Sequence, residues 1–245
     1  MVDKAYFKMA EDMEKGFFHP VGTPENNLQV KILHQRLLAP FPSGEHEVRP
    51  ATGGFKSRPL FYIDPRAYAK RLDLVLGLGG YSILTDEIKL AGETMPIYGP
   101  YNMETKSKPV IGDKSGLMVA TSVTIEVHHA LLSKKVSNVG EKSIVDLTAD
   151  NKTTSAFAQA YKRAATHLGV AAYLYYITMP DMTFDKNNGF GFKVPPDDVM
   201  HNALKEVGFK RICEITGAEV SWKEAAASMH YTGRVLCRAE TEKYL

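Results

Sequence analysis

Apolar residues recur at helical spacing through residues 151–176, a stretch that carries positive charge and no Asp or Glu. A single helix here places five apolar residues on one side: Phe157, Ala160, Ala164, Leu168 and Ala171. The other side is polar and holds Ser155, Gln159, Lys162, Arg163 and Thr166. Thr153 or Thr154 is a suitable N-cap, and the first turn has no acidic residue to complement the positive end of the helix dipole. The stretch is therefore either a solvated surface helix or a helix whose start binds phosphate.

Proline and glycine set the borders of the elements that come earlier in the chain. Residues 1–27 are polar and end in several turn residues, so we expect a weakly structured arm. A short helix follows over residues 28–38 and ends at two prolines. A strand over residues 59–63 then runs into Asp64, an N-cap followed by proline, and this pair begins a helix over residues 65–76.

Alternating apolar and polar residues predict a sheet in the middle of the chain. Two stretches alternate in this way, residues 81–90 and residues 117–129. Between them, residues 91–116 are punctuated by glycine and proline and indicate an elaborated hairpin connection. A further short strand is expected over residues 143–147. These elements predict an α+β fold, with an antiparallel β-sheet of three or more strands and helices packed on one face.

The C-terminal part of the chain has a different character. A loop rich in Pro, Gly and Asn follows Met179, and helices are expected near residues 199–207 and 222–229. This part could pack on the core, mediate assembly or form a separate small helical unit. Residues 199–217 also fit a helix-turn-helix pattern, because a glycine lies between two apolar-periodic segments, although such patterns are common by chance.

Composition agrees with a soluble intracellular protein of one main domain. The 245 residues are 44% hydrophobic, which is enough to bury a substantial core. No apolar run approaches the roughly 20 residues of a membrane span, and the N-terminus lacks the features of a signal or transit peptide. Cys213 and Cys237 lack metal-binding spacing and are expected to be reduced thiols. We therefore expect a cytoplasmic protein with no membrane partner.

Catalytic motifs are missing from the sequence. It has no GxxxxGK[ST] phosphate loop and no GxSxG, HExxH or CxxC motif. His128 and His129 are neighbours in a predicted strand and point to opposite faces, so both cannot easily reach one metal ion. Asp146 and Asp150 could be nuclease carboxylates that hold magnesium, but charged residues beside a strand and a helix start are the simpler explanation. We expect a non-enzymatic protein with no catalytic residue, metal or cofactor.

Two tracts of the chain resemble a known family. The first is RLLAPFPSGEHEVRPATGGFKSRPLFYIDPRAYAKRLDLVLGLGGYSI at residues 36–83, with the patterns RLxAPFP and Y-[VI]-D-x-R-A-x-x-x-RLD. The second is TTSAFAQAYKRAATHLGVAAYLY at residues 153–175, where a Lys-Arg pair precedes a short glycine-containing segment. Both are similar to the Rad fifty-two superfamily of single-strand annealing proteins, in particular to its prokaryotic and phage branch typified by DNA damage response protein A.

The resemblance implies a division of the chain and a particular core. It covers roughly residues 28–180, which it identifies as the annealing core with a β-β-β-α arrangement. Residues 1–27 are then a polar N-terminal arm, and residues 181–245 are a C-terminal helical extension without a family signature.

The resemblance also implies DNA-binding positions. Arg49 corresponds to a basic position in the strand before a glycine turn, and the Lys-Arg pair corresponds to the lining of the family's inner DNA groove. The candidate DNA-binding residues are all cationic: Arg49, Lys56, Arg58, Lys152, Lys162 and Arg163. Many relatives carry another basic residue one turn after the pair, where this chain has Thr166 and His167. The grip on phosphate is therefore expected to be weaker here, or to be completed from elsewhere.

Other cationic and aromatic residues have simpler explanations. Arg66, Lys70 and Arg71 have Asp73 nearby, so we expect them on a solvated helix face. Three aromatic residues are expected in the core or an interface: Tyr68, Tyr81 and Phe61. Phe55 lies in a glycine-rich loop and is a candidate for base stacking as well as for packing.

The expected function is ATP-independent binding and annealing of single-stranded DNA during recombination or repair. The resemblance implies a homo-oligomeric ring, which multiplies the few phosphate contacts of one subunit. Single-stranded DNA and further copies of the chain are the expected partners, and a separate single-stranded DNA-binding protein is a further candidate. The location implied is the bacterial cytoplasm, at the nucleoid or in a phage-infected cell. Two alternatives stay open: protection of 3′ single-stranded ends without annealing, and a metal-dependent nuclease.

Overall fold

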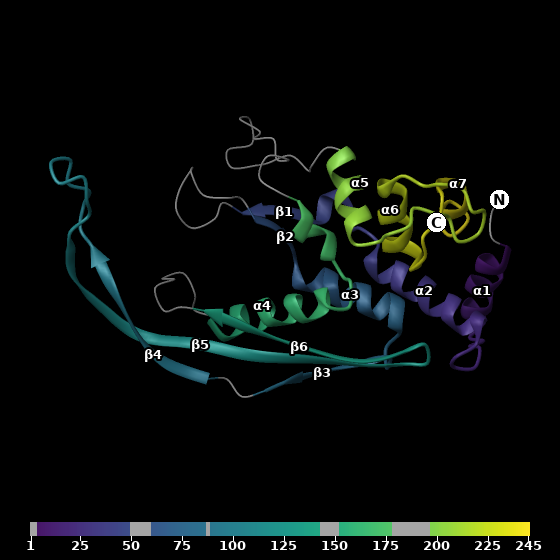
Figure 1. The fold of residues 1–245 in the computed structure, drawn as a ribbon, viewed down its shortest axis with the longest axis horizontal. Helices are drawn as coiled ribbons and strands as arrows, with labels where there is room; N and C mark the ends of the chain where they lie inside the picture. The colour runs from purple at the N-terminus through teal and green to yellow at the C-terminus, as the bar shows by residue number, and fades with distance from the viewer. Residues whose placement is uncertain (1–3, 50–59, 87–88, 143–151, 178–196) are drawn as a thin grey trace. The chain divides into compact units, whose positions relative to one another are not determined.

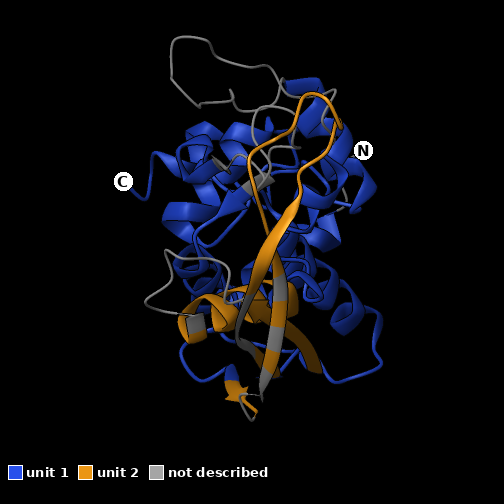
Figure 2. Cartoon of the chain, turned by 90° about the vertical axis from the view of Figure 1, so that its left-hand side faces the viewer, with its two compact units in different colours: residues 1–82, 127–134, 165–245 blue, residues 83–126, 135–164 orange. Residues whose placement is uncertain are grey.

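The structure, a computed structural model, describes residues 4–49, 60–86, 89–142, 152–177 and 197–245. It is an α+β protein whose described residues form seven α-helices, a two-stranded sheet and a four-stranded antiparallel sheet (Figure 1). The chain divides into two compact units (Figure 2). Unit 1 consists of Met1–Ser82, Val127–Lys134 and Ala165–Leu245, and unit 2 consists of Ile83–Glu126 and Lys135–Ala164. Segments of the two units alternate along the chain, and residues 28–180 are shared between both units.

The first two helices of unit 1 lie where the sequence predicted a weakly structured arm. α1 (Lys4–Glu14) buries Met9 and Met13 and packs against α2 (Pro24–Leu38). α2 starts earlier than expected, because the Thr23 hydroxyl accepts a hydrogen bond from the Asn26 amide at 3.1 Å and caps the helix. The prediction of a weakly structured arm is wrong, since the apolar residues of α1 share one helical face and find a partner in α2.

The next elements of unit 1 include the strand and the helix that the sequence predicted over residues 59–63 and 65–76. A 3-10 turn, η1 (Ser43–Glu45), leads to β1 (His46–Arg49), which pairs antiparallel with β2 (Leu60–Ile63). β2 leads into α3 (Pro65–Leu76), where the Asp64 carboxylate accepts a hydrogen bond from the Arg66 amide at 2.8 Å. Gly77 ends the helix at φ 78°, a conformation that glycine adopts without a steric penalty.

Arg71 of α3 binds the backbone at the end of α2. Its guanidinium donates hydrogen bonds to the backbone carbonyl oxygens of Arg36, Ala39 and Pro40, and it lies 4.3 Å from the ring centroid of Phe41. The prediction that Arg71 lies on a solvated face is wrong, because its residue is only 2% exposed. The end of α2 leaves carbonyl groups without helical partners, and Arg71 satisfies them. Burial lowers the pKa of Arg71 to about 10.

The C-terminal part of unit 1 is helical, as predicted. It contains α5 (Asp197–Glu206), α6 (Trp222–Thr232) and the short α7 (Arg238–Thr241). Ser221 and Glu224 form a capping box at the start of α6. Residues 207–221 are all described and contain no helix, so residues 199–217 do not form the helix-turn-helix that their pattern resembled.

A buried ion cluster holds this C-terminal part against α1 and α2. Arg36 donates to the Glu214 carboxylate through Nε at 3.1 Å and through Nη2 at 2.7 Å, and Nη2 also reaches Glu14 at 2.8 Å. Arg234 Nε lies 3.4 Å from the same Glu214 carboxylate, whose side chain is fully buried. Burial alone would lower the pKa of Arg36, but Glu214 and Glu14 outweigh it and hold that pKa above its usual value. Of the three roles considered for this part, packing on the rest of the fold is the one observed.

β5 (Val110–His129) is the central strand of the four-stranded sheet. β3 (Tyr81–Thr85), β4 (Lys89–Tyr98) and β6 (Leu132–Lys142) all pair with it. Val123, Ile125 and Val127 are buried, which confirms the predicted alternation in this strand. The β4–β5 ladder runs from Lys89 opposite Ala120 to Tyr98 opposite Val110. Much of the expected connection over residues 91–116 is therefore regular strand, in a long two-stranded ribbon (Figure 1).

The tip of this ribbon exposes apolar side chains. The tip is closed by backbone hydrogen bonds between Gly99 and Pro109 at 2.8 Å and between Asn102 and Ser107 at 2.8 Å. Six large apolar residues near it are each between 42% and 81% exposed: Ile97, Tyr98, Tyr101, Met103, Val110 and Ile111. Exposed apolar side chains that gather on one element can form an interaction surface.

α4 (Lys152–Thr166) confirms most of the helix predicted over residues 151–176 and corrects its end. The expected single helix to residue 176 stops at Thr166, because Gly169 at φ 104° and Ala171 at φ 57° break the helical path. The short 3-10 helix η2 (Ala172–Tyr176) follows. α4 begins at Lys152, so Thr153 and Thr154 lie inside the first turn and not at the N-cap.

Candidate nucleic-acid interface

In unit 2, α4 lies against β6 with unusually close backbone contact. Gly140 of β6 faces Ala156 and Ala160 of α4, and all three are buried. A Cβ atom placed on Gly140 would lie 2.0 Å from the Ala156 carbonyl oxygen and 2.6 Å from the Ala160 amide nitrogen. Only glycine fits this position, and the alanines opposite it add little bulk. The helix is thereby held at a fixed height over the strand.

Two polar side chains of α4 bind the backbone of β6. The Gln159 side-chain oxygen accepts a hydrogen bond from the Glu141 amide at 2.7 Å, and Arg163 Nη1 donates to the Val139 carbonyl at 2.8 Å. Gln159 and Arg163 are four residues apart, which is a rise of about 6 Å along a helix. Their partners, Glu141 and Val139, are two residues apart, which is about 6.6 Å along a strand. The two spacings agree, and the order of the partners shows that α4 runs antiparallel to β6. These bonds occupy backbone groups on the edge of β6 that faces away from β5, and they protect this edge strand from pairing elsewhere.

The Lys-Arg pair sits on the outer part of this helix. Arg163 is exposed although its guanidinium is anchored on β6, and Lys162 is half-buried. A guanidinium has five N–H donors, so one bond to Val139 leaves donors that can face an anion. α4 contains Lys152, Lys162 and Arg163 and no acidic residue. The pair is thus held by a rigid helix whose own charge is entirely positive.

The first turn of α4 is open to solvent. Thr153, Thr154 and Ser155 are all exposed, and none of the residues in the turn is acidic. The partial positive charge of a helix start is therefore not offset within the helix itself. The helix has 15 residues, which is long enough for its dipole to be effective at the first turn.

The other sequence-predicted residues are placed only in part. Arg49 ends β1, with its backbone opposite Leu60, and its side chain lies outside the described residues. The same is true of the Lys152 side chain at the start of α4. Lys56 and Arg58 lie wholly outside the described residues. Of the six candidates, the structure brings together Lys162 and Arg163 on one described surface.

One residue near this surface was missed by the sequence analysis. Lys142 ends β6, next to Glu141, whose amide binds Gln159 of α4. Its position beside α4 depends on the pairing of helix and strand, so no local pattern could have shown it. Arg66 and Lys70 of α3 are exposed, as expected, and belong to unit 1.

The predicted aromatic and nuclease positions have mixed outcomes. Tyr68 is buried, which confirms its expected place in the core, whereas Phe55 lies outside the described residues. The expected strand at residues 143–147 and the two nuclease candidates, Asp146 and Asp150, also lie outside them.

Groups suited to metal or thiol chemistry are limited in the part of the chain that is described. There, no cluster of three or more His, Cys, Asp or Glu side chains could hold a metal ion. The His129 ring accepts a hydrogen bond from the Leu131 amide at 3.1 Å, while His128 is exposed. Cys213 and Cys237 are free thiols, as predicted. None of the described helices has the length and apolar character needed to cross a membrane.

No family model matches the chain, and no curated protein matches it either. The geometry of α4 and β6 and the sequence patterns are therefore the basis for a functional proposal.

Proposed function

We propose that this protein binds single-stranded DNA and anneals complementary strands without ATP, as a homo-oligomeric ring in recombination or repair. The observation that carries the proposal is α4: a helix with three cationic residues, no acidic residue and an open first turn, fixed on β6 through Gly140. The resemblance of residues 36–83 and 153–175 to the Rad fifty-two superfamily supports the same function.

The chemistry of α4 suits a DNA backbone better than a base edge. Lys162, Arg163 and the amides of the first turn are suited to bind phosphate groups. Such contacts fix the position of a DNA strand without reading its sequence. A strand held by its phosphates keeps its bases free to pair with a second strand. Annealing needs this arrangement and requires no nucleophile, metal or nucleotide.

The ribbon tip of unit 2 supports the assembly part of the proposal. Its exposed apolar residues, among them Tyr98, Met103 and Ile111, are the kind of surface that a second copy of the chain would cover. In an assembly, each subunit adds its few phosphate contacts to a continuous strand, so the affinity for a long strand rises steeply.

An annealing assay tests the proposal. Labelled complementary oligonucleotides of mixed sequence are incubated with the protein, first in EDTA and then in magnesium, and duplex formation is followed on a native gel. Accelerated annealing in EDTA is the expected result. Binding without acceleration would replace the proposal with the first alternative, protection of 3′ single-stranded ends. Magnesium-dependent loss of the labelled strand would replace it with a nuclease.

A further inference from the structure

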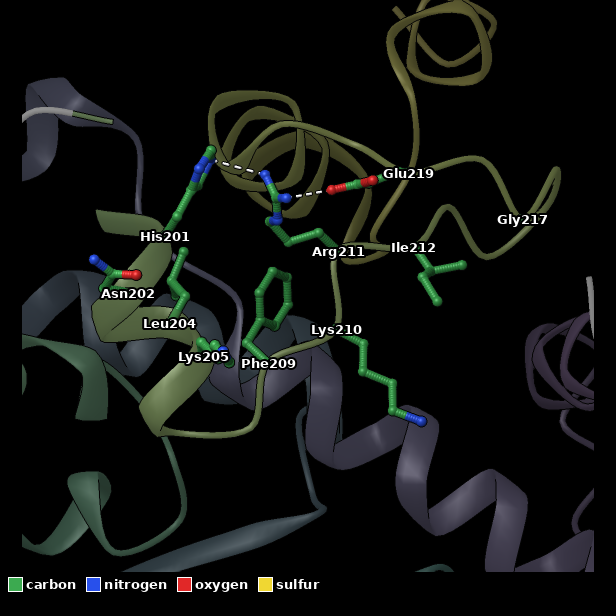
Figure 3. Close-up of a pocket in the computed structure, with 10 residues that line it drawn as sticks. All are labelled: His201, Asn202, Leu204, Lys205, Phe209, Lys210, Arg211, Ile212, Gly217 and Glu219. Carbon is green, nitrogen blue, oxygen red and sulfur yellow. Dashed lines mark hydrogen bonds and ion pairs between the residues drawn. The ribbon is translucent and has the colours of Figure 1, made fainter. Parts of the chain in front are cut away.

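Unit 1 contains a pocket of about 520 Å³ between α5 and the segment that follows it (Figure 3). α5 contributes His201, Asn202, Leu204 and Lys205. The following segment contributes Phe209, Lys210, Arg211, Ile212, Gly217 and Glu219. This volume lies within the range of roughly 300 to 1,000 Å³ that is typical of ligand pockets.

Arg211 is the central polar group of this pocket. Its Nη1 donates a hydrogen bond to Nε2 of His201 at 2.8 Å, and its Nη2 pairs with the Glu219 carboxylate. Figure 3 shows the three side chains in a row, with Arg211 in the middle. The bond to His201 holds the guanidinium from one side, which lowers the entropy cost of binding a carboxylate on the other.

The pocket carries excess positive charge around an apolar floor. Its lining contains three cationic residues, Lys205, Lys210 and Arg211, and one carboxylate, Glu219. The lysines are exposed, and among the described residues neither ammonium group forms an ion pair. The floor is formed by Leu204 and Phe209, both buried, while Ile212 is 39% exposed at its side.

Glu219 shows how the pocket holds a carboxylate. Its side chain is 72% exposed although it pairs with Arg211, so the pair is accessible to solvent. A salt bridge this exposed contributes little stability, and a carboxylate from another molecule can replace Glu219 at small cost. Glu219 thus stands where a ligand carboxylate would bind.

We propose that this pocket binds a short acidic peptide segment of a partner protein. A carboxylate of the peptide takes the place of Glu219 on Arg211, and a neighbouring apolar side chain lies on the exposed Ile212. Further acidic residues of the peptide face Lys205 and Lys210. A nucleic-acid strand fits less well, since the aromatic ring here, Phe209, is only 6% exposed and cannot stack on a base. The site is independent of the DNA-binding function proposed for α4.

Fluorescence anisotropy tests the site. The probe is a fluorescein-labelled peptide of four aspartates followed by leucine and phenylalanine, and the full-length protein is titrated into it. We expect saturable binding that weakens about tenfold in Arg211→Ala, because a charge-assisted hydrogen bond is lost. Glu219→Gln should bind the peptide several times more tightly, because the internal competitor is removed. Circular dichroism melting of each variant shows whether the fold is kept.

Matched controls separate the pocket from general charge. Arg238 and Glu242 form an exposed pair of the same type outside the pocket, so Arg238→Ala and Glu242→Gln should leave peptide binding unchanged. A peptide with asparagine in place of aspartate should not bind. The proposal is overturned if neither the wild type nor Glu219→Gln binds the acidic peptide, or if Glu219→Gln binds it more weakly. Displacement of the peptide by oligothymidine, with loss of oligothymidine binding in Arg211→Ala, would assign the pocket to nucleic acid instead.

Discussion

At the scale of single residues, Arg163 combines a bond to the β6 backbone with an exposed position. Its bond to the Val139 carbonyl protects the edge of β6, and its exposed position leaves it available to phosphate. Lys162, its neighbour on α4, is half-buried.

We predict that Lys162→Ala and Arg163→Ala both weaken single-strand binding, and that Arg163→Ala also destabilises the protein. Each lost phosphate contact should reduce the magnitude of the slope of log affinity against log salt by about 0.7. Arg163→Ala should in addition lower the free energy of unfolding by about 0.5 to 1 kcal/mol, since one partly exposed hydrogen bond is lost. Oligothymidine titrations at several salt concentrations and urea unfolding measure the two effects. Lys31→Ala, an exposed lysine of α2, is the control; an unchanged slope in the double variant would refute the DNA surface.

Gly140 gives a second residue-scale prediction. Gly140→Ala places a Cβ atom 2.0 Å from the Ala156 carbonyl oxygen, so helix and strand must move apart. We expect a loss of about 1 to 3 kcal/mol, as in other overpacked sites, together with weaker DNA binding, because α4 loses its fixed position. Gly92→Ala is the matched control in β4, where a Cβ meets no atom within 4 Å. Equal stability of the two variants, measured by urea unfolding, would contradict the close contact.

At the scale of the element, the first turn of α4 links helix stability to ligand charge. An acidic residue placed there should stabilise the helix and repel phosphate, two effects of opposite sign from one charge. A substitution that weakens binding by damaging the fold should lower stability, whereas this one should raise it.

We therefore predict that Thr154→Glu raises the free energy of unfolding by about 0.3 to 1 kcal/mol and weakens single-strand binding. Thr154 is exposed, so the longer side chain meets no steric barrier. Thr154→Gln has nearly the same shape without the charge and should leave DNA binding close to that of the wild type. Thermal unfolding and anisotropy with oligothymidine test both variants; equal binding by the Glu and Gln variants would argue against a phosphate site at this turn.

At the scale of the whole molecule, segments far apart in sequence are joined by buried charge. One cluster of charged residues connects α1, α2 and the C-terminal part of unit 1: Glu14, Arg36, Glu214 and Arg234. A buried charge that loses its partner is costly, because neither water nor another group replaces the lost interaction.

Glu214→Ala should destabilise unit 1 by about 3 to 5 kcal/mol, since Arg36 remains buried with only Glu14 as a partner. Trp222 is the one tryptophan of the chain and is buried in α6, so its emission reports on unfolding of this unit. The exposed Glu242→Ala, which also removes an arginine partner, should cost less than about 1 kcal/mol. Similar urea midpoints for the two variants would show that the buried cluster contributes little.

Assembly is the other prediction at this scale. The wild type should sediment as a multimer at micromolar concentration, or form one on a long oligonucleotide. Serine substitutions at Tyr98 and Ile111 of the ribbon tip should shift it to smaller species, because they remove exposed apolar surface that contributes to association. Val21→Ser, at an exposed apolar residue of unit 1, serves as the control. A wild type that stays monomeric with and without DNA would exclude the ring.

The sequence by itself determined much of the local structure. Asp64, Pro65 and Gly77 bounded α3 correctly, and the alternation through Val123 and Ile125 identified β5, because caps, turns and side-chain period act over a few residues. α5 and α6 were also predicted near their observed positions. The DNA-binding function and the family remain predictions, supported by charge and motif.

Only the tertiary structure decided which polar residues are buried and what they bind. Arg71 looked like a surface residue until the carbonyl groups after α2 proved to be its partners, and Gly140 carried no signal until α4 was seen lying on it. The α1 helix and the length of the β4–β5 ribbon depend in the same way on contacts or pairing with distant residues. Such partners lie far away along the chain, so the pattern around a single residue does not contain them.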